Sequence, residues 1–540
     1  VSLTGIMCVP QRLCCRQTQR PTTNPIEPMH RILPSARRWP LHKIASTRRI
    51  EEAATSTLPA NTLMQRAGGA VARLAMAVAP HAERIWIAAG PGNNGGDGLE
   101  ASVHLQAAGK QVLVTWLGAA SGERRAPDDS LHSHQRAVAA GVTIIDHAPL
   151  SSQGFDFAID ALLGIGATRS PSGSMAEAVA RLNCKDFPVL AVDLPSGLDA
   201  DTGRKLGDAC VRADHTLTLL TLKPGLFTAS GRDQAGEVWF DTLGLQEEAR
   251  ADAWLSALTT PNAPRLHAQH KGSFGDVAVI GGAAGMAGAA LLAARAAHAA
   301  GAGRVFVEWL QNTSSGLSGV DLLHPELMMR NGWTQSEPSV LEKATVVCGC
   351  GGGDAVRDRL PRLLSLAGRL VLDADALNAV ALDPQLMTLL RSRIQRSRAT
   401  VLTPHPLEAA RLLGCDTAVV QSDRLAAAQA LTDLTRCTVV LKGSGTVTAA
   451  PGFAPHINGT GNGSLAGGGT GDVLAGWIGG LWAQAQRHRD EDELGIAFAT
   501  ASRAVAEHGA AADPLQPGAL PASELIRRLH NGLRMGHPAE

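Results

Sequence analysis

The chain has 540 residues, which is too long for one hydrophobic core and predicts two domains with additional segments. Lys plus Arg and Asp plus Glu number 49 each, and this zero formal net charge excludes a general attraction to nucleic acid or to an anionic membrane. No apolar run approaches the ~18 residues that a membrane-spanning helix needs. The nine cysteines form no Cys-x-x-Cys pair, so a reducing cytoplasm is favoured over a disulfide framework or a zinc site.

The first fifty residues differ in composition from the rest of the chain. They are rich in Lys and Arg, carry a single acid, Glu27, and contain several prolines. An Arg-rich, acid-poor start is typical of an organellar transit peptide, but the prolines interrupt any amphipathic helix. We therefore expect residues 1–42 to be a disordered extension, with Met29 as a natural start of the protein.

From residue 84 the chain alternates short apolar runs with helical segments. This alternation predicts a parallel sheet with helices on both faces, in a domain that spans residues 43–245. The expected strands are 84–90, 111–116, 142–145, 157–163, 189–194 and 237–240, and the expected helices are 99–108 and 130–140.

Residues 246–269 show no period and are expected to be a linker. A second alternating pattern follows over residues 270–535, so the fold class is α/β with two three-layer αβα domains. Its expected strands are 276–282, 304–307, 344–349, 370–373 and 438–442, with an Ala-rich helix over 287–300.

The stretch from Asn458 to Asp472 is the strongest functional signal. Six glycines lie between Gly461 and Gly471, and an apolar segment typical of a helix follows directly. Glycine has no side chain to bury, so these residues indicate a backbone that approaches a bulky anion such as a phosphate. A flexible linker is the alternative, but a linker is not usually followed by an apolar helix. At the helix start, Asp472 is a candidate base for phosphoryl transfer.

Five further motifs of the second half lie beside predicted strands. Ligands of open α/β sheets bind at the carboxyl ends of the strands, so such motifs favour a binding site. Each motif alone has a simpler explanation. His405 could be a capped loop histidine, Glu408 an acid in the first turn of a helix, and Lys442 with its following glycine the corner of a hairpin. The motifs are Lys271–Asp276, Gly281–Ala289, Asp373–Asn378, Thr403–Glu408 and Lys442–Thr446.

Polar residues also follow strands in the first half. The Gly92–Gly98 segment lies between a strand and a helix and contains two asparagines. Asp160 ends one predicted strand, and the Asp193–Gly197 segment ends another. Oxygens from neighbouring strand ends suit K⁺ or Mg²⁺, whereas the alternative is that Asp160 and Asp193 only cap the turns that follow.

Together these motifs resemble the bifunctional NAD(P)H-hydrate repair enzymes. Residues 43–245 resemble the NAD(P)H-hydrate epimerase domain, which has a Rossmann-like fold. Residues 270–535 resemble the ADP-dependent (S)-NAD(P)H-hydrate dehydratase, which has a ribokinase-like fold, and the match runs from about Lys271 to Leu529. The family's Gly-Pro-Gly-Leu-Gly turn appears here as Gly349-Cys-Gly-Gly-Gly353.

In the second domain, the resemblance implies that Asp472 is the catalytic base and that ADP is the phosphoryl donor, with Mg²⁺ implied by that transfer. The hydrated nicotinamide nucleotide would contact Ala289, Gly351, His405 and Asp472. The adenine nucleotide would be held by Lys442, Gly443, Ser444, Gly445, Thr446 and Gly471.

In the first domain, the resemblance implies a K⁺ site formed by Asn94, Asp160 and Ser196, and Asp160 is our candidate acid/base residue. The hydrated cofactor would contact Asn93, Asn94, Gly95, Gly96, Asp97, Gly164, Ile165, Gly166, Ala167, Thr168, Arg169, Ser170 and Asp193.

The expected function is repair of hydrated nicotinamide nucleotides: the first domain interconverts the R and S hydrates, and the second dehydrates the S form, giving NAD(P)H, AMP and phosphate. The alternative is an ATP-dependent kinase for a small metabolite, with an N-terminal domain that binds a nucleotide without turnover. We expect a homo-oligomer in the bacterial cytoplasm, with no nucleic-acid or membrane partner.

Overall fold

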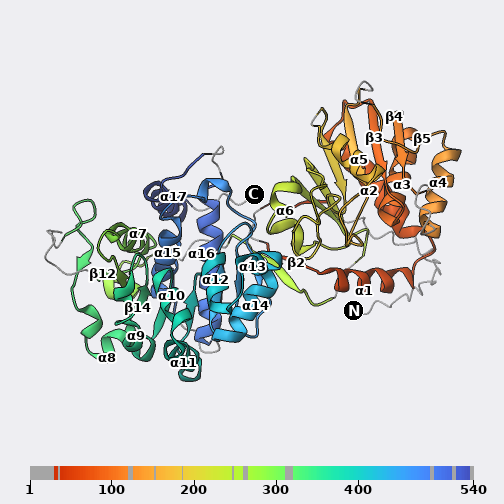
Figure 1. Cartoon of the computed structure of the whole chain (residues 1–540). Coiled ribbons are helices and arrows are strands. Elements are labelled where there is room, and N and C mark those ends of the chain that lie inside the picture. Colours follow the sequence, from red (N-terminus) through yellow and green to blue (C-terminus); the bar gives the residue numbers. More distant parts are fainter. Residues whose placement is uncertain are drawn as a thin grey trace, which may run out of the picture.

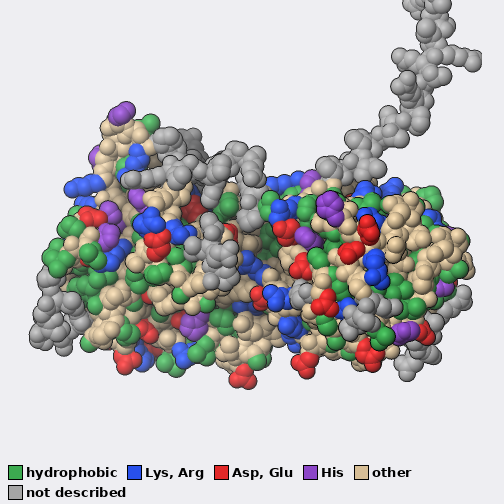
Figure 2. Space-filling view, turned by 90° about the horizontal axis from the view of Figure 1, so that it is seen from above, with side chains coloured by type: hydrophobic (Ala, Val, Ile, Leu, Met, Phe, Trp, Pro, Cys, Tyr) green, Lys and Arg blue, Asp and Glu red, His purple; other side chains and the backbone are tan. Residues whose placement is uncertain are grey.

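The computed structural model describes residues 29–33, 37–118, 126–150, 154–184, 186–245, 249–258, 265–310, 320–486, 492–513 and 518–535. It contains two sheets, each covered by helices, and the two lobes lie side by side (Figure 1). The predicted fold class, α/β with two αβα domains, is therefore confirmed. Basic and acidic side chains are interspersed on the face seen from above (Figure 2). Among the described helices, none has the length and apolar character needed to cross a bilayer.

The first sheet has eight strands, and all of its pairings are parallel except that of β1 with β9. In order across the sheet they are β1 (His30–Arg31), β9 (Glu237–Asp241), β8 (His215–Leu219), β7 (Val189–Val192), β6 (Phe157–Ala161), β3 (Arg84–Ala89), β4 (Gln111–Trp116) and β5 (Thr143–Ile145). The helices are α1 (Ile44–Thr55), α2 (Thr62–Val78), α3 (Asn93–Ala107), α4 (Asp128–Ala139), α5 (Ser174–Leu182) and α6 (Gly231–Gln234), with the short 3₁₀ helix η1 (Pro224–Phe227).

Both faces of this sheet are buried, as the apolar runs predicted. Ile85 and Ile87 of β3 belong to one hydrophobic cluster, whereas Trp86 and Ala88 belong to another on the opposite face. Because successive side chains of a strand point to opposite faces, a strand buried on both sides must be apolar throughout.

The second sheet has eleven strands. In order they are β13 (Met328–Met329), β12 (Arg304–Trp309), β11 (Asp276–Gly281), β14 (Thr345–Cys348), β15 (Arg369–Leu372), β16 (Thr400–Leu402), β17 (Thr438–Leu441), β18 (Val447–Ala449), β19 (His456–Ile457), β10 (Ala253–Leu255) and β2 (Trp39–Leu41). The run from β13 to β17 is parallel, and β17, β18 and β19 form an antiparallel meander.

Eleven α-helices are described in the second domain. They are α7 (Ala287–Ala299), α8 (Pro338–Lys343), α9 (Leu360–Leu366), α10 (Asp375–Leu382), α11 (Pro384–Ser392), α12 (Pro406–Leu413), α13 (Thr417–Ser422), α14 (Arg424–Thr435), α15 (Thr470–Gln484), α16 (Glu493–Ala510) and α17 (Ala522–Met535). The short 3₁₀ helices are η2 (Lys271–Phe274), η3 (Trp333–Gln335), η4 (Asp354–Val356), η5 (Ile394–Arg396) and η6 (Gly463–Leu465).

Glycines set the position of α15 against α7. A β-carbon on Gly476 would lie 2.0 Å from the carbonyl oxygen of Ala293, and one on Gly480 would lie 2.4 Å from that of Ala297. The two helix backbones therefore approach as closely as they do only because these positions carry no side chain. This packing fixes the start of α15, where Asp472 lies.

Three expectations require correction. The described part of residues 1–42 is not a disordered extension, because β1 pairs with β9 of the first sheet and β2 pairs with β10 of the second. Residues 246–269 are not simply a linker, because they contain β10. These strands are only two or three residues long, and such short strands leave no periodic signal. The helix expected at 99–108 begins earlier, at Asn93.

Candidate active sites at the carboxyl ends of the two sheets

Asp472 lies in the first turn of α15, after Gly469, whose φ of 85° is left-handed. Burial raises the pKa of Asp472 to about 6, and the negative charge of Asp373 adds to this effect. The thiol of Cys350 donates a hydrogen bond to the Asp472 carboxylate. A carboxylate with this pKa is still mostly ionised at neutral pH and is basic enough to accept a proton.

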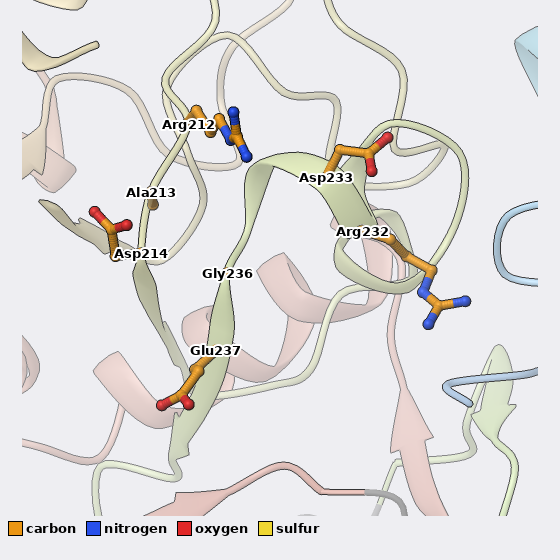
Figure 3. Close-up of a pocket in the computed structure, with 7 residues that line it drawn as sticks. All are labelled: Arg212, Ala213, Asp214, Arg232, Asp233, Gly236 and Glu237. Carbon is orange, nitrogen blue, oxygen red and sulfur yellow. The ribbon is translucent and has the colours of Figure 1, made fainter. Parts of the chain in front are cut away.

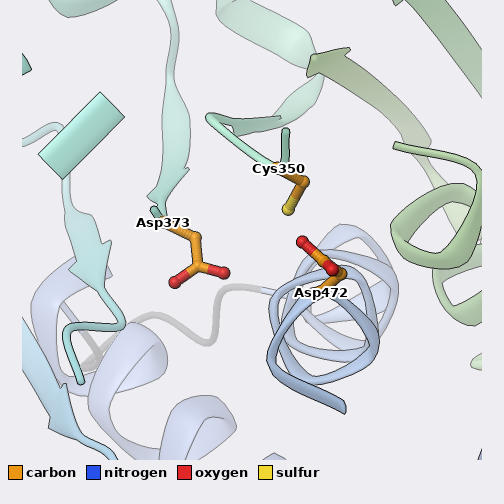
Figure 4. A group of neighbouring side chains, drawn as sticks. All are labelled: Cys350, Asp373 and Asp472. Carbon is orange, nitrogen blue, oxygen red and sulfur yellow. The ribbon is translucent and has the colours of Figure 1, made fainter. Parts of the chain in front are cut away.

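Cys350, Asp373 and Asp472 point toward one another from the loop after β14, the end of β15 and the start of α15 (Figure 4). One ligand atom from each lies within 4.8 Å of the others. Lys442 occupies the remaining side, with its Nζ 2.7 Å from Asp373 Oδ1. The ammonium group and the thiol do not fit a dedicated Mg²⁺ cage, which requires oxygen ligands. The cluster can therefore balance charge and exchange a proton, and its side chains do not form an all-oxygen Mg²⁺ cage.

His405 and Glu408 form a capping box at the start of α12. His405 Nδ1 accepts hydrogen bonds from the backbone N–H groups of Leu407 and Glu408, at 3.1 and 3.3 Å. The Glu408 carboxylate accepts one from the His405 backbone at 2.8 Å. Both residues thus act as caps of α12, as the simpler explanation predicted. About half of the imidazole stays exposed, and its Nε2 lies 3.2 Å from Glu408 Oε1. Burial raises the pKa of Glu408 to about 7, and sequence reasoning missed this group as a site residue.

The other residues expected to bind ligands in this domain lie close together in pairs. A β-carbon on Gly351, which has a φ of 58°, would lie 2.9 Å from the Ala289 side chain. One on Gly471 would lie 3.3 Å from Lys442 Nζ. The segment from Lys442 to Thr446 connects β17 to β18 and so begins beside the carboxylate cluster. The structure thus brings the residues predicted for the hydrate and for the nucleotide to one edge of the sheet.

In the first domain, Asp160 lies on β6 and is fully buried with Ser196. Ser196 donates from its hydroxyl to Asp160 Oδ1 at 2.6 Å and from its backbone N–H to Oδ2 at 2.8 Å. Burial raises the pKa of Asp160 to about 6, against the opposing effect of these hydrogen bonds. The structure therefore brings two of the three predicted K⁺ ligands into direct contact.

Asn94, the third predicted ligand, is near this pair. Its amide lies beside Gly164, where an added β-carbon would be 3.3 Å from Asn94 Oδ1. Its Nδ2 is buried with no hydrogen-bond partner among the described residues. The carbonyl oxygen of Leu163 is 3.3 Å from the Ser196 hydroxyl and is a further oxygen at this point. A carboxylate, a hydroxyl and amide oxygens fit K⁺, which prefers such hard ligands.

Asn93 to Asp97 form the first turns of α3 rather than a loop before it. The first N–H groups of a helix have no intrahelical partner and suit an anionic group, although here the Gly96 N–H already donates to the Gly92 carbonyl at 3.2 Å. The pKa of Asp97 is raised well above its ordinary value by burial and by the carboxylates of Asp193, Glu51 and Glu100. Glu51 comes from α1, and sequence reasoning missed it.

Asp193 forms a buried ion pair with Lys223, which also donates to the carbonyl oxygen of Leu219 at 2.7 Å. Its φ of 65° is unusual for a residue other than glycine and often marks a functional position. Lys223 is a residue of this site that sequence reasoning missed. The segment expected to contact the hydrate follows β6 and is half-buried to exposed: Gly164, Ile165, Gly166, Ala167, Thr168, Arg169 and Ser170.

Comparisons with known proteins agree with both halves. Residues 277–529 match the NAD(P)H-hydrate dehydratase family, and residues 60–225 match the family described as YjeF-related protein N-terminus. The bifunctional NAD(P)H-hydrate repair enzyme Nnr of Escherichia coli (strain K12) is 35% identical over 468 residues, which cover 84% of this chain and 85% of that protein. The bifunctional NAD(P)H-hydrate repair enzyme of Leishmania braziliensis is 35% identical over 520 residues, covering 88% and 90%. The crystal structure of ADP/ATP-dependent NAD(P)H-hydrate dehydratase from Bacillus subtilis, co-crystallised with ATP/Mg²⁺, is 28% identical, with a TM-score of 0.40, and covers 51% of this chain and 94% of that chain.

The fold and the two carboxylate sites thus define a two-domain α/β enzyme with one candidate active site at the end of each sheet. The chain belongs to the family of bifunctional NAD(P)H-hydrate repair enzymes, with an epimerase domain followed by a dehydratase domain.

Proposed function

We propose that this chain repairs hydrated NADH and NADPH in two steps. The first domain interconverts the R and S epimers of the hydrate at C6 of the nicotinamide ring. The second domain transfers a phosphoryl group from ADP to the C6 hydroxyl of the S epimer. Phosphate then leaves C6, driven by the lone pair of the ring nitrogen, and loss of a proton from C5 of the resulting iminium ion restores the C5=C6 double bond. The products are NAD(P)H, AMP, phosphate and a proton.

The main support for the second step is the environment of the Asp472 carboxylate. Its carboxylate has a pKa of about 6, lies at the start of a glycine-preceded helix, and is within reach of Asp373 and Lys442. We assign to Asp472 the removal of the hydroxyl proton, and to the backbone N–H groups of Gly467 to Gly471 the stabilisation of charge on the transferring phosphoryl group. Mg²⁺ would enter with the phosphates of the nucleotide, because the neighbouring side chains do not form a cage for it.

For the first step we propose that Asp160 acts as the acid/base group that helps the C6 hydroxyl leave and return, and that Asn94, Asp160 and Ser196 hold K⁺. The contact between Asp160 and Ser196 supports the oxygen-rich site, and burial of Asp160 supports a carboxyl that both gives and accepts a proton near pH 6. The remaining contacts to the hydrate and to ADP stay as predicted from the resemblance. A homo-oligomer and a cytoplasmic location stay predictions.

The test is an incubation of the full chain with chemically hydrated NADH as mixed epimers, with Mg²⁺, K⁺ and either ADP or ATP, followed at the NADH absorbance band. Recovery of all hydrate at a rate above spontaneous epimerisation supports both activities. Recovery that stops near the S fraction would contradict the epimerase assignment. No recovery, together with a stable phosphorylated product from a small hydroxylated metabolite, would instead support the kinase alternative.

A further inference from the structure

The two domains touch at the segment that is predicted to bind ADP. The hydroxyl of Ser444 donates to the carbonyl oxygen of Ala229 at 2.9 Å, and the Ala229 N–H donates to the Ser444 carbonyl at 3.1 Å. The buried Thr228 hydroxyl donates to the same Ser444 carbonyl at 3.2 Å. A β-carbon on Gly445 would lie 2.1 Å from the carbonyl oxygen of Phe227. The two backbones therefore approach so closely that no side chain fits at Gly445.

Arg232 of α6 makes the second contact, four residues along the chain from Thr228. Its guanidinium donates to three successive carbonyl oxygens at the start of the glycine-rich loop, those of Gly459, Thr460 and Gly461, at 3.1, 3.2 and 2.6 Å. Figure 3 shows that this side chain points away from the other labelled residues of a small pocket beside α6. The guanidinium has fixed geometry, so three such bonds constrain the loop backbone.

The two contacted segments are bonded to each other. The backbone N–H of Asn458 donates to the carbonyl of Thr446 at 2.9 Å, which links the end of the β17–β18 connection to the glycine-rich loop. Asp513 accepts a hydrogen bond from the Gly461 N–H at 2.7 Å, and its charge favours the cationic form of Arg232. The first domain thus holds both backbone segments that frame the predicted nucleotide site.

The chain also crosses between the domains elsewhere. β1 belongs to the first sheet and β2, only a few residues later, belongs to the second. Leu41 of β2 bridges to Leu222, just before η1 and the 228–232 segment. These crossings keep the 228–232 segment against the second domain.

We propose that residues 228–232 of the epimerase domain position the nucleotide-binding backbone of the dehydratase domain, with Thr228 and Arg232 as positioning residues. The affinity of the second domain for ADP then depends on the first domain, because residues 228–232 hold part of the backbone of the ADP site in place. This inference rests on the proposed function, since the binding of ADP at Lys442–Thr446 is itself part of that proposal.

The test compares Arg232→Ala and Thr228→Val with the matched control Asp233→Ala, an exposed neighbour on α6. In the full chain, Arg232→Ala should raise the KM for ADP about tenfold or more, because small displacements of a binding backbone are costly. Direct titration with ADP should weaken to a similar extent, while the rate of epimerisation and the melting temperature stay near wild type. Arg232→Lys, which keeps the charge but not the planar fork, should fall between Arg232→Ala and wild type.

Thr228→Val keeps the size of the side chain and removes one hydroxyl, so it provides a test even if Arg232→Ala does not fold. It should raise the KM for ADP by a smaller factor, with epimerisation unchanged. The inference is overturned if wild type binds ADP and both variants keep its affinity within about twofold, or if every activity falls together with the melting temperature. A wild-type chain that binds no ADP would instead overturn the proposed function.

Discussion

Lys442 Nζ lies 2.7 Å from Asp373 Oδ1 and 4.0 Å from Glu408 Oε2, so this lysine balances two carboxylates, one at the end of β15 and one in the first turn of α12. Burial opposes the charge on Lys442, but the two carboxylates outweigh it and raise its pKa. Asp472 is close to the same set. The lysine therefore controls the electrostatic environment of the candidate base, in addition to the nucleotide contact expected from the sequence.

Asp472→Asn should abolish dehydration while ADP binding is kept. The amide has the shape of the carboxylate but cannot accept the hydroxyl proton, and general-base catalysis is worth about 10²–10⁴-fold in rate. The rate of S-hydrate repair and the affinity for ADP are measured on the same preparation. Turnover within tenfold of wild type would contradict the assignment of Asp472 as base.

Dehydration should lose rate as the pH falls through about 6, because Asp472 must be ionised to act and its pKa is about 6. Lys442→Met removes a positive charge and leaves Asp373 unpaired, which raises the pKa of Asp472 further. The acidic limb of the kcat profile should therefore move to higher pH. Lys343→Met, at an exposed lysine of α8, is the control and should leave the limb in place. If the acidic limb of the kcat profile is unchanged in Lys442→Met, Lys442 does not influence the pKa of Asp472.

Asp160→Asn should stop use of the R hydrate while the S hydrate is still repaired. The loss is expected because the amide neither transfers the proton nor supplies an anionic ligand to K⁺, whereas the second sheet is untouched. Starting from separated epimers, the R-hydrate rate should fall about 10²-fold or more and the S-hydrate rate should stay within twofold. Asp129→Asn, at an exposed acid of α4, is the matched control. Equal loss on both epimers would indicate a structural role for Asp160.

The sequence predicted the architecture well because central strands such as β6, β7, β14 and β17 are buried on both faces and are therefore mostly apolar. It also predicted two strand ends, since Asp160 and Asp373 each come after a buried apolar run. The sequence missed β8 because polar His and Thr residues alternate with its leucines. The shorter missed strands have a different cause. β1, β2 and β10 are too short to show a period, and their pairing depends on residues more than a hundred positions away. Long-range pairs such as Arg232 with Gly461 leave no local signal for the same reason.

The left-handed backbone at Gly351 gives a last prediction for the hydrate site. Its φ of 58° costs a residue with a side chain about 1–2 kcal/mol, and the new β-carbon would also lie 2.7 Å from the carbonyl oxygen of Met286. Gly351→Ala should therefore displace this turn and the adjoining Ala289. Both residues are expected to contact the hydrate, so KM for the S hydrate should rise more than KM for ADP.

The control for this change is Gly532→Ala. Gly532 lies on α17, outside the residues predicted to bind ligands, and an added β-carbon there meets nothing within 4 Å. It should leave both KM values unchanged and should not lower the melting temperature, because alanine is the better helix former. Steady-state kinetics with each substrate varied in turn, on both variants, make the comparison. A rise in KM for ADP alone in Gly351→Ala would place this turn on the nucleotide side of the site.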